Sequence, residues 1–136
     1  MRIMIDTNVF ISIMVFNSKT LNKMLNDICE KHTLVLSSYI LEEIAAVINR
    51  KFPDKAPLID AILFNMPFEL EYTPHVLPVH NFFNIRDPKD EKILYSAISA
   101  DVDILITGDK DFFEIEILRP EILSPSEFIE KEKVTP

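Results

Sequence analysis

The sequence is poor in the residues that build disulfides and zinc sites. It has one cysteine, Cys29, so no disulfide framework can form within the chain and no zinc site can be built on cysteines. Its three histidines lack the helical spacing of metal ligands. So little cysteine is typical of proteins from a reducing cytosol, and we therefore expect a cytoplasmic protein.

Long apolar runs are also lacking. The apolar N-terminal stretch is interrupted at Asp6, Asn8 and Asn17, and it falls short of the roughly 20 uninterrupted apolar residues that a membrane span needs. It has no cleavage-site pattern either. We therefore expect no signal peptide, no transmembrane helix and no membrane partner.

Basic residues are outnumbered by acidic ones. The chain has 14 lysines and arginines against 22 aspartates and glutamates, which gives a net charge of −8. This balance argues mildly against a nucleic-acid partner, because phosphate backbones are usually met by surfaces rich in lysine and arginine. The argument weakens if the excess acid is concentrated in one metal-binding cleft, since bound divalent cations invert the local field.

Strand-like and helix-like segments alternate along the chain, whose 136 residues fit one domain over residues 1–136. Strands are expected at 2–7, 33–37 and 102–109, helices at 19–31, 39–51, 56–66 and 87–101, and a short strand with a capped helix within 121–132. The strands are apolar on both faces, which predicts a parallel sheet between layers of helices. Residues 67–84 are left open, with one further strand possible in "FELEYT".

Two aspartates lie at the carboxyl ends of predicted strands, after their apolar part. Asp6 comes after "IMI" and Asp109 comes at the end of "DILITGD". In open sheets of this kind, ligands bind just beyond the carboxyl ends of the strands. A charge buried inside a strand would cost several kcal/mol if it had no partner. The two positions therefore predict a ligand site at this edge of the sheet.

Helical geometry brings further acids to this site. Glu43 lies about 100° from the centre of the apolar stripe of its helix, whereas Glu42 lies about 160° away and points to solvent. Asp90 falls on the helix face that carries Ile93 and Leu94. Four carboxylates can then converge, with Asp111 beside the last of them: Asp6, Glu43, Asp90 and Asp109.

Four close carboxylates repel one another, and their pKa values would rise if nothing neutralised them. A hard divalent cation removes this problem, since Mg²⁺ prefers oxygen ligands and is commonly held by carboxylates together with a substrate phosphate. Such a site can activate water for attack on a phosphodiester. The set of acids therefore favours hydrolytic nuclease chemistry.

Each acid also has a structural explanation. Asp6 could cap the helix that follows it, Asp109 could be a turn residue, and Asp90 could favour a helix dipole with Asp87 as the cap. Glu43 could belong to a solvated face. Some basic residues flank these acids and could either hold RNA phosphates or be scattered surface charges: Arg50, Lys51, Lys55, Arg86, Lys89, Lys92 and Lys110.

Four stretches, in this order, resemble the PIN-domain family: "MIDTNVF", "LSSYILEEI", "RDPKDEKILYSA" and "ILITGDKDF". The resemblance implies a three-layer α/β/α sandwich with a mainly parallel central sheet, and an Mg²⁺- or Mn²⁺-dependent ribonuclease. Many short members of the family are VapC-type toxins restrained by a small antitoxin protein, and the last two stretches resemble a toxin subgroup in particular. The resemblance also implies a homodimer.

The resemblance assigns roles to individual residues. The residues that match the family's catalytic acids are Asp6, Glu43, Asp90 and Asp109. Those that match its acidic metal-binding positions are Asp6, Asp90, Asp109 and Asp111. The residues that match polar positions commonly used to orient ligands or water are Asn8 and Thr107.

Three functions are compared. The first is a metal-dependent endoribonuclease, the toxin of a toxin–antitoxin pair, in which Glu43 is a ligand or proton acceptor and cleavage leaves a 5′-phosphate. The second is a non-catalytic PIN-like module that binds RNA or a protein. The third is a phosphatase of the aspartyl-phosphate type, which requires a second aspartate two residues after Asp6, where this chain has Asn8. The first is favoured.

Overall fold

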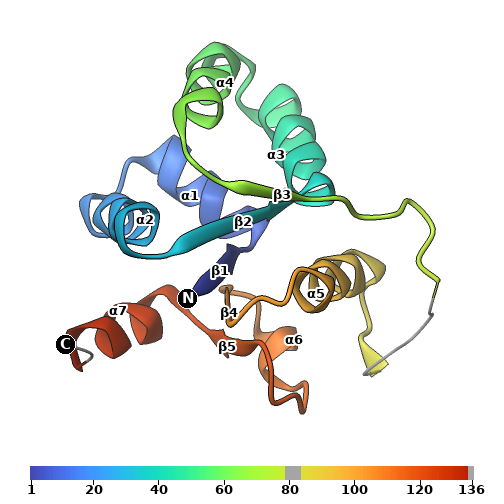
Figure 1. Ribbon diagram of the computed structural model, residues 1–136. Coiled ribbons are helices and arrows are strands. Elements are labelled where there is room, and N and C mark those ends of the chain that lie inside the picture. The colour runs from blue at the N-terminus through green and yellow to red at the C-terminus, as the bar shows by residue number, and fades with distance from the viewer. Residues whose placement is uncertain (79–83, 135–136) are drawn as a thin grey trace.

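The computed structural model of the protein describes residues 1–78 and 84–134, and within them the chain forms a three-layer α/β/α sandwich (Figure 1). The central sheet has five parallel strands in the order β3-β2-β1-β4-β5. Its strands are β1 (Arg2–Ile5), β2 (Thr33–Ser37), β3 (Glu69–Glu71), β4 (Ile104–Ile106) and β5 (Glu121–Leu123). The predicted fold class is confirmed.

Helices cover both faces of the sheet. They are α1 (Thr7–Phe16), α2 (Lys19–Lys31), α3 (Ser38–Lys51), α4 (Ala56–Asn65), α5 (Pro88–Ser99), α6 (Lys110–Phe113) and α7 (Pro125–Val134), with a 3-10 turn at Pro53–Lys55. Helices α1 to α4 gather on one side of the sheet and α5 and α6 on the other (Figure 1). None of the helices among the described residues is long and apolar enough to cross a membrane.

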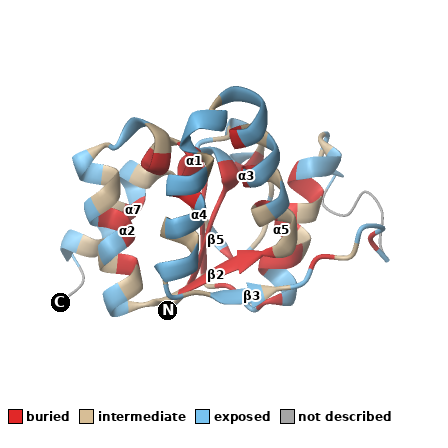
Figure 2. Cartoon of the chain, turned by 90° about the horizontal axis from the view of Figure 1, so that it is seen from above, coloured by how far each residue is buried: buried red, intermediate tan, exposed pale blue. Residues whose placement is uncertain are grey.

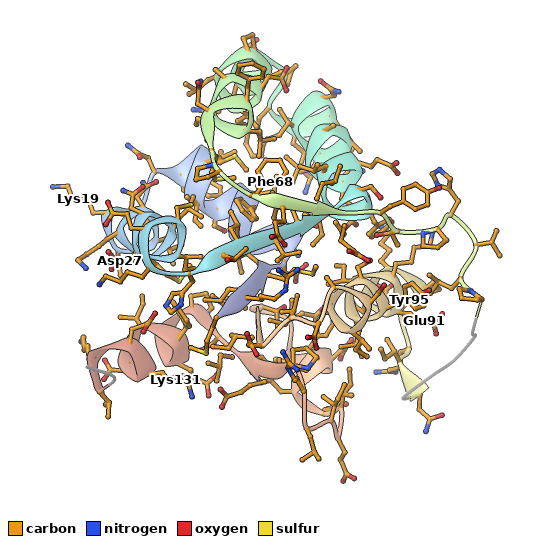
Figure 3. All side chains as sticks on the ribbon, in the orientation of Figure 1. Lys19, Asp27, Phe68, Glu91, Tyr95 and Lys131 are labelled. Atoms are coloured by element: carbon orange, nitrogen blue, oxygen red, sulfur yellow. The ribbon has the colours of Figure 1, made fainter. Side chains whose placement is uncertain are left out.

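The core lies between the sheet and these helices. Strands β1, β2 and β4 are buried along nearly their whole length. The red strand β2 in Figure 2 is one of them. Phe68 packs against this core where the chain passes from α4 into β3 (Figure 3). The buried strands fix the positions of the residues that follow them, because their ends cannot shift without disturbing the core.

Side-chain caps place several helices where the sequence predicts them. Ser37 caps α3 by accepting a hydrogen bond from the Ile40 amide, and Asp87 caps α5 from just before Pro88. Ser124 and Glu127 form the expected reciprocal capping box at the start of α7. These caps explain why the predicted helix starts agree with the structure to within a residue or two.

Three features were not specified by the sequence. Helix α1 was not assigned, because its residues are apolar without a helical period and most of them are buried. The four-residue helix α6 was not expected. Within the open segment 67–84, the possible strand forms β3 at the edge of the sheet, and residues 79–83 lie outside the described residues. That residues 1–136 form one domain stays a prediction.

Truncation of Phe10 should destabilise the fold, because its side chain is completely buried between α1 and the sheet. We expect Phe10→Ala to lower the free energy of unfolding by about 3–5 kcal/mol. Phe64→Ala, at a position that is 90% exposed on α4, should change it by less than about 0.5 kcal/mol. Urea denaturation measures both, and equal losses would contradict this account of the core.

Candidate metal centre

Two of the predicted acids stand side by side at the carboxyl edge of the sheet. Asp6 follows β1 and is 5% exposed, and Asp109 lies three residues beyond β4. Strands β1 and β4 are direct neighbours, with Ile5 paired to Ile106, so their ends meet at one place. The predicted meeting of Asp6 and Asp109 at this edge is therefore a property of the strand order.

The other two predicted acids reach the same place from helices. Glu43 on α3 and Asp90 on α5 line one cleft together with Asp6 and Asp109. The cleft has a volume of about 530 Å³. Glu43 is half-buried while Glu42 is exposed, as the helical phase predicts. All four carboxylates thus come from different elements and share one cavity.

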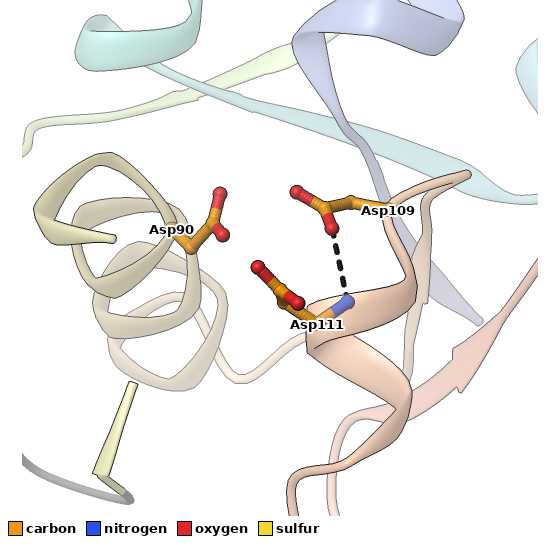
Figure 4. Close-up of side chains that lie close together, drawn as sticks. All are labelled: Asp90, Asp109 and Asp111. Atoms are coloured by element: carbon orange, nitrogen blue, oxygen red, sulfur yellow. Dashed lines mark hydrogen bonds between the residues drawn. The ribbon is translucent and has the colours of Figure 1, made fainter. Parts of the chain in front are cut away.

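Asp90, Asp109 and Asp111 form the tightest group (Figure 4). One carboxylate oxygen from each lies within 4.8 Å of the others. Asp111 reaches this group from the first turn of α6, whose cap is Asp109: the Oδ1 atom of Asp109 accepts a hydrogen bond of 2.9 Å from the Asp111 amide. Three converging oxygens are the type of ligand set that Mg²⁺ or Mn²⁺ prefers.

Asp90 provides the test of whether a cation fits here. Its carboxylate is 7% exposed, and its Oδ2 atom is buried without a hydrogen-bond partner among the described residues. Burial, together with the charges of Asp109 and Asp87, raises the pKa of Asp90 to about 7. A buried carboxylate oxygen without a partner is costly, and a cation bound between Asp90, Asp109 and Asp111 would remove that cost. The residues fit a divalent ion.

Both oxygens of Asp6 are hydrogen-bonded. Oδ1 accepts a bond of 2.7 Å from the Thr7 amide and so caps α1, while Oδ2 accepts one of 2.8 Å from the Thr107 hydroxyl. Burial is the largest effect on the pKa of Asp6 and raises it, although these two hydrogen bonds oppose the rise. Asp6 is therefore a helix cap, and the capping explanation and a role in the cleft are compatible.

The polar residues around the acids differ in what they contact. Thr107 contacts two of the acids, since its hydroxyl donates to Asp6 and accepts a hydrogen bond of 3.1 Å from the Asp109 amide. Asn8 lines the cleft but is exposed, and within the described residues its side chain forms no hydrogen bond with these carboxylates. Thr7 contacts a third acid, since its hydroxyl donates a hydrogen bond of 2.8 Å to Glu43.

Three of the basic residues named from the sequence also line the cleft, namely Arg50, Lys51 and Lys89. Within residues 1–78 and 84–134, none of them forms an ion pair. The cleft is therefore acidic on its floor and carries cations on its rim. This is the charge arrangement that a phosphate ester bound over a divalent ion requires.

Comparison with known proteins agrees with this geometry. The model of the PIN domain matches residues 2–111, and the chain belongs to the PIN-domain family, whose members are typically nucleases. A comparison with curated proteins finds no match. The fold is similar to a chain in the crystal structure of VapBC2 from Rickettsia felis bound to a DNA fragment from their promoter, with a TM-score of 0.68 and 18% identity over 91% of this chain and 98% of that one.

The raised pKa of Asp90 predicts how the metal-free protein responds to pH. Unfolded aspartate ionises near pH 3.9, so between about pH 4 and 7 the folded state retains a proton that the unfolded state has lost. With respect to Asp90 alone, the folded state is therefore most stable below pH 4, where Asp90 is protonated in both states, and it loses stability as the pH rises through 7 and the buried carboxyl ionises. Asp90→Asn should therefore raise the free energy of unfolding at pH 8 by about 1–2 kcal/mol, allowing for solvent screening.

Urea denaturation in EDTA at pH 4, 6 and 8 measures the difference between wild type and Asp90→Asn. The two proteins should be closest at pH 4 and furthest apart at pH 8. Asp60→Asn, on the exposed side of α4, serves as the control and should show no such trend. If Asp90→Asn were less stable than wild type at pH 8, the predicted cost of the buried Asp90 charge would be wrong.

Proposed function

We propose that this PIN-domain protein is a metal-dependent endoribonuclease that hydrolyses RNA phosphodiester bonds as the toxin of a toxin–antitoxin pair. The observation that carries the proposal is the buried Oδ2 atom of Asp90 beside Asp109 and Asp111, to which none of the described residues donates a hydrogen bond. A purely structural cluster would satisfy that oxygen with a hydrogen-bond donor, whereas a metal centre leaves it available as a ligand.

The acids and the polar residue Thr107 divide into two roles. Asp90, Asp109, Asp111 and Asp6 would hold Mg²⁺ or Mn²⁺, and Thr107 orients Asp6 and the loop that carries Asp109. When bound, the ion supplies Lewis-acid activation of water and neutralises charge on the phosphate. Asp6 would contribute through the remaining lone pairs of its hydrogen-bonded oxygens.

In this proposal Glu43 would accept the proton of the attacking water. Its Oε1 atom accepts the Thr7 hydroxyl, which fixes the carboxylate against the floor of the cleft, and its remaining lone pairs are available to attacking water. Water attacks the phosphorus atom and its proton passes to Glu43, while the bond to the 3′-oxygen breaks and that oxygen takes up a proton from solvent water. One product strand then begins with a 5′-phosphate and the other ends with a 3′-hydroxyl.

The proposed partners follow from the family and the similar structure. VapBC2 from Rickettsia felis was crystallised as a complex on promoter DNA, and its chain shares this fold. By analogy with the family, we propose that a small antitoxin protein binds this chain and that the chain forms a homodimer. We also propose that the protein is located in the cytoplasm. RNA is the substrate, since the cleft joins a metal-binding floor to a cationic rim.

Purified protein should cleave RNA in Mg²⁺ or Mn²⁺ and lose the activity in EDTA. Asp6→Asn and Asp109→Asn should each lower the cleavage rate by at least about 10²-fold while keeping wild-type melting temperatures to within a few degrees, because asparagine still caps a helix. Gel analysis of a labelled RNA measures the rate. Undiminished cleavage by Asp6→Asn would refute the site.

The same proteins test the rest of the proposal. If wild type binds RNA in Mg²⁺ but never cleaves it, the non-catalytic binding module is the better description. Expression of wild type, but not of Asp6→Asn, should arrest growth if the protein is a toxin. Normal growth with wild type expressed as active enzyme would contradict the toxin assignment and leave the nuclease assignment intact.

Neighbouring glutamates on α3 give a matched pair of variants. Glu43→Gln should lower the maximal cleavage rate by about 10²–10⁴-fold, because an amide cannot accept the proton from water. Glu42→Gln removes the same charge from the same helix, but it points to solvent and should leave the rate within about twofold. Equal effects from the two substitutions would show that only the charge of α3 matters.

A further inference from the structure

The cleft continues beyond the acids as a groove between α1 and α3. On α1 it is lined by residues from Thr7 through Ile11 to Phe16, and on α3 by residues from Glu43 through Val47 to Arg50. At 1.5 Å per residue, the groove extends about 10 Å along α3 beyond Glu43 and about 15 Å along α1 beyond Asp6. Its far end is therefore distinct from the metal centre.

The far end holds an exposed aromatic ring. Phe16 ends α1 and is 69% exposed, although it lines the groove. Its ring meets that of Phe52 edge to face, with centroids 6.3 Å apart and an angle of 85° between the rings. This contact supports the Phe16 ring and leaves most of its surface open. A single exposed phenylalanine is ordinary, but one supported at the end of a groove can bind a flat apolar group.

Two cations stand beside this ring. Arg50 and Lys51 are exposed in the last turn of α3, line the same groove, and form no ion pair within the described part of the chain. In a protein with net charge −8, unpaired cations at one end of a cleft are conspicuous. Guanidinium groups bind phosphate oxygens in pairs, and lysine binds them as a point charge.

We propose that the far end of the groove binds a nucleotide of the substrate strand some way along the chain from the cleaved bond, with its base stacked on Phe16 and its phosphate held by Arg50 and Lys51. An open aromatic face beside unpaired cations is the combination by which proteins bind single-stranded nucleic acid. A base within a duplex has both faces covered by its neighbours, so this site accepts only an unpaired strand. The inference rests on the proposed ribonuclease function and deepens it.

Phe16 is a positioning residue, so its variants should change binding more than chemistry. In the cleavage assay, Phe16→Ala should raise KM about tenfold and leave kcat within about twofold, because stacking acts equally before and during the reaction. Phe16→Trp and Phe16→Tyr should restore KM. Phe64→Ala, on an exposed phenylalanine of α4 outside the groove, is the control and should change neither value.

Binding without cleavage gives an independent measurement. Fluorescence anisotropy with a labelled oligoribonucleotide, all in an Asp109→Asn background, should show about tenfold weaker binding for Phe16→Ala and no change for Phe64→Ala. Arg50→Gln and Lys51→Gln should weaken binding and lower the slope of log K against log salt by about 0.7 for each lost phosphate contact.

Abasic substitutions in the oligonucleotide locate the stacked base. At one position, removal of the base should weaken binding to the Asp109→Asn protein but add nothing in the Phe16→Ala protein, because both changes remove the same contact. The inference would be overturned if the Phe16→Ala protein bound the intact oligonucleotide as tightly as the protein that keeps Phe16. A Phe16→Ala protein that lost only the affinity for a protein partner would overturn it too. A wild type that neither cleaves nor binds RNA would instead refute the proposed function.

Discussion

The hydrogen bond between the Thr107 hydroxyl and Asp6 joins the two strand ends on which the site depends. It spans 101 residues of sequence, and the same hydroxyl accepts the Asp109 amide, so one small side chain sets the position of two carboxylates. The bond is possible only because β1 and β4 are direct neighbours in the sheet. The order of the strands thus allows the bond, and the bond fixes both the loop after β4 and the carboxylates on the floor of the cleft.

The acidic cluster lowers the stability of the fold, because it buries like charges close together. Asp90 is buried beside like charges, and no described group donates a hydrogen bond to its Oδ2 atom. The surrounding core tolerates this because β1, β2 and β4 are buried and closely packed, and because α5 begins with a side-chain cap and a proline. Stability supplied by apolar packing elsewhere holds together a group of charges that would otherwise separate.

Much of the fold and the site can be predicted from this one sequence. Asp6 and Asp109 are found because apolar strands end beside them, and Glu43 is separated from Glu42 because a helix repeats every 3.6 residues. Helix α1 cannot be predicted in this way, because it is buried on several sides and its apolar residues therefore show no helical spacing. The Thr7 bond to Glu43 and the support of Phe16 by Phe52 depend on how helices α1 and α3 pack, which no local pattern records.

Asp6 and Asp109 each commit one oxygen to the first turn of a helix. Because each of these residues is both a helix cap and a member of the acidic site, fewer substitutions are tolerated there during evolution. A descendant without a cation site must still cap α1 and α6, and substitution by asparagine, serine or threonine at these two positions would cost it the least stability. Asp90 has no such obligation, and an apolar residue there would relieve the buried charge. Loss of function would thus favour capping residues in place of Asp6 and Asp109 but an apolar residue in place of Asp90.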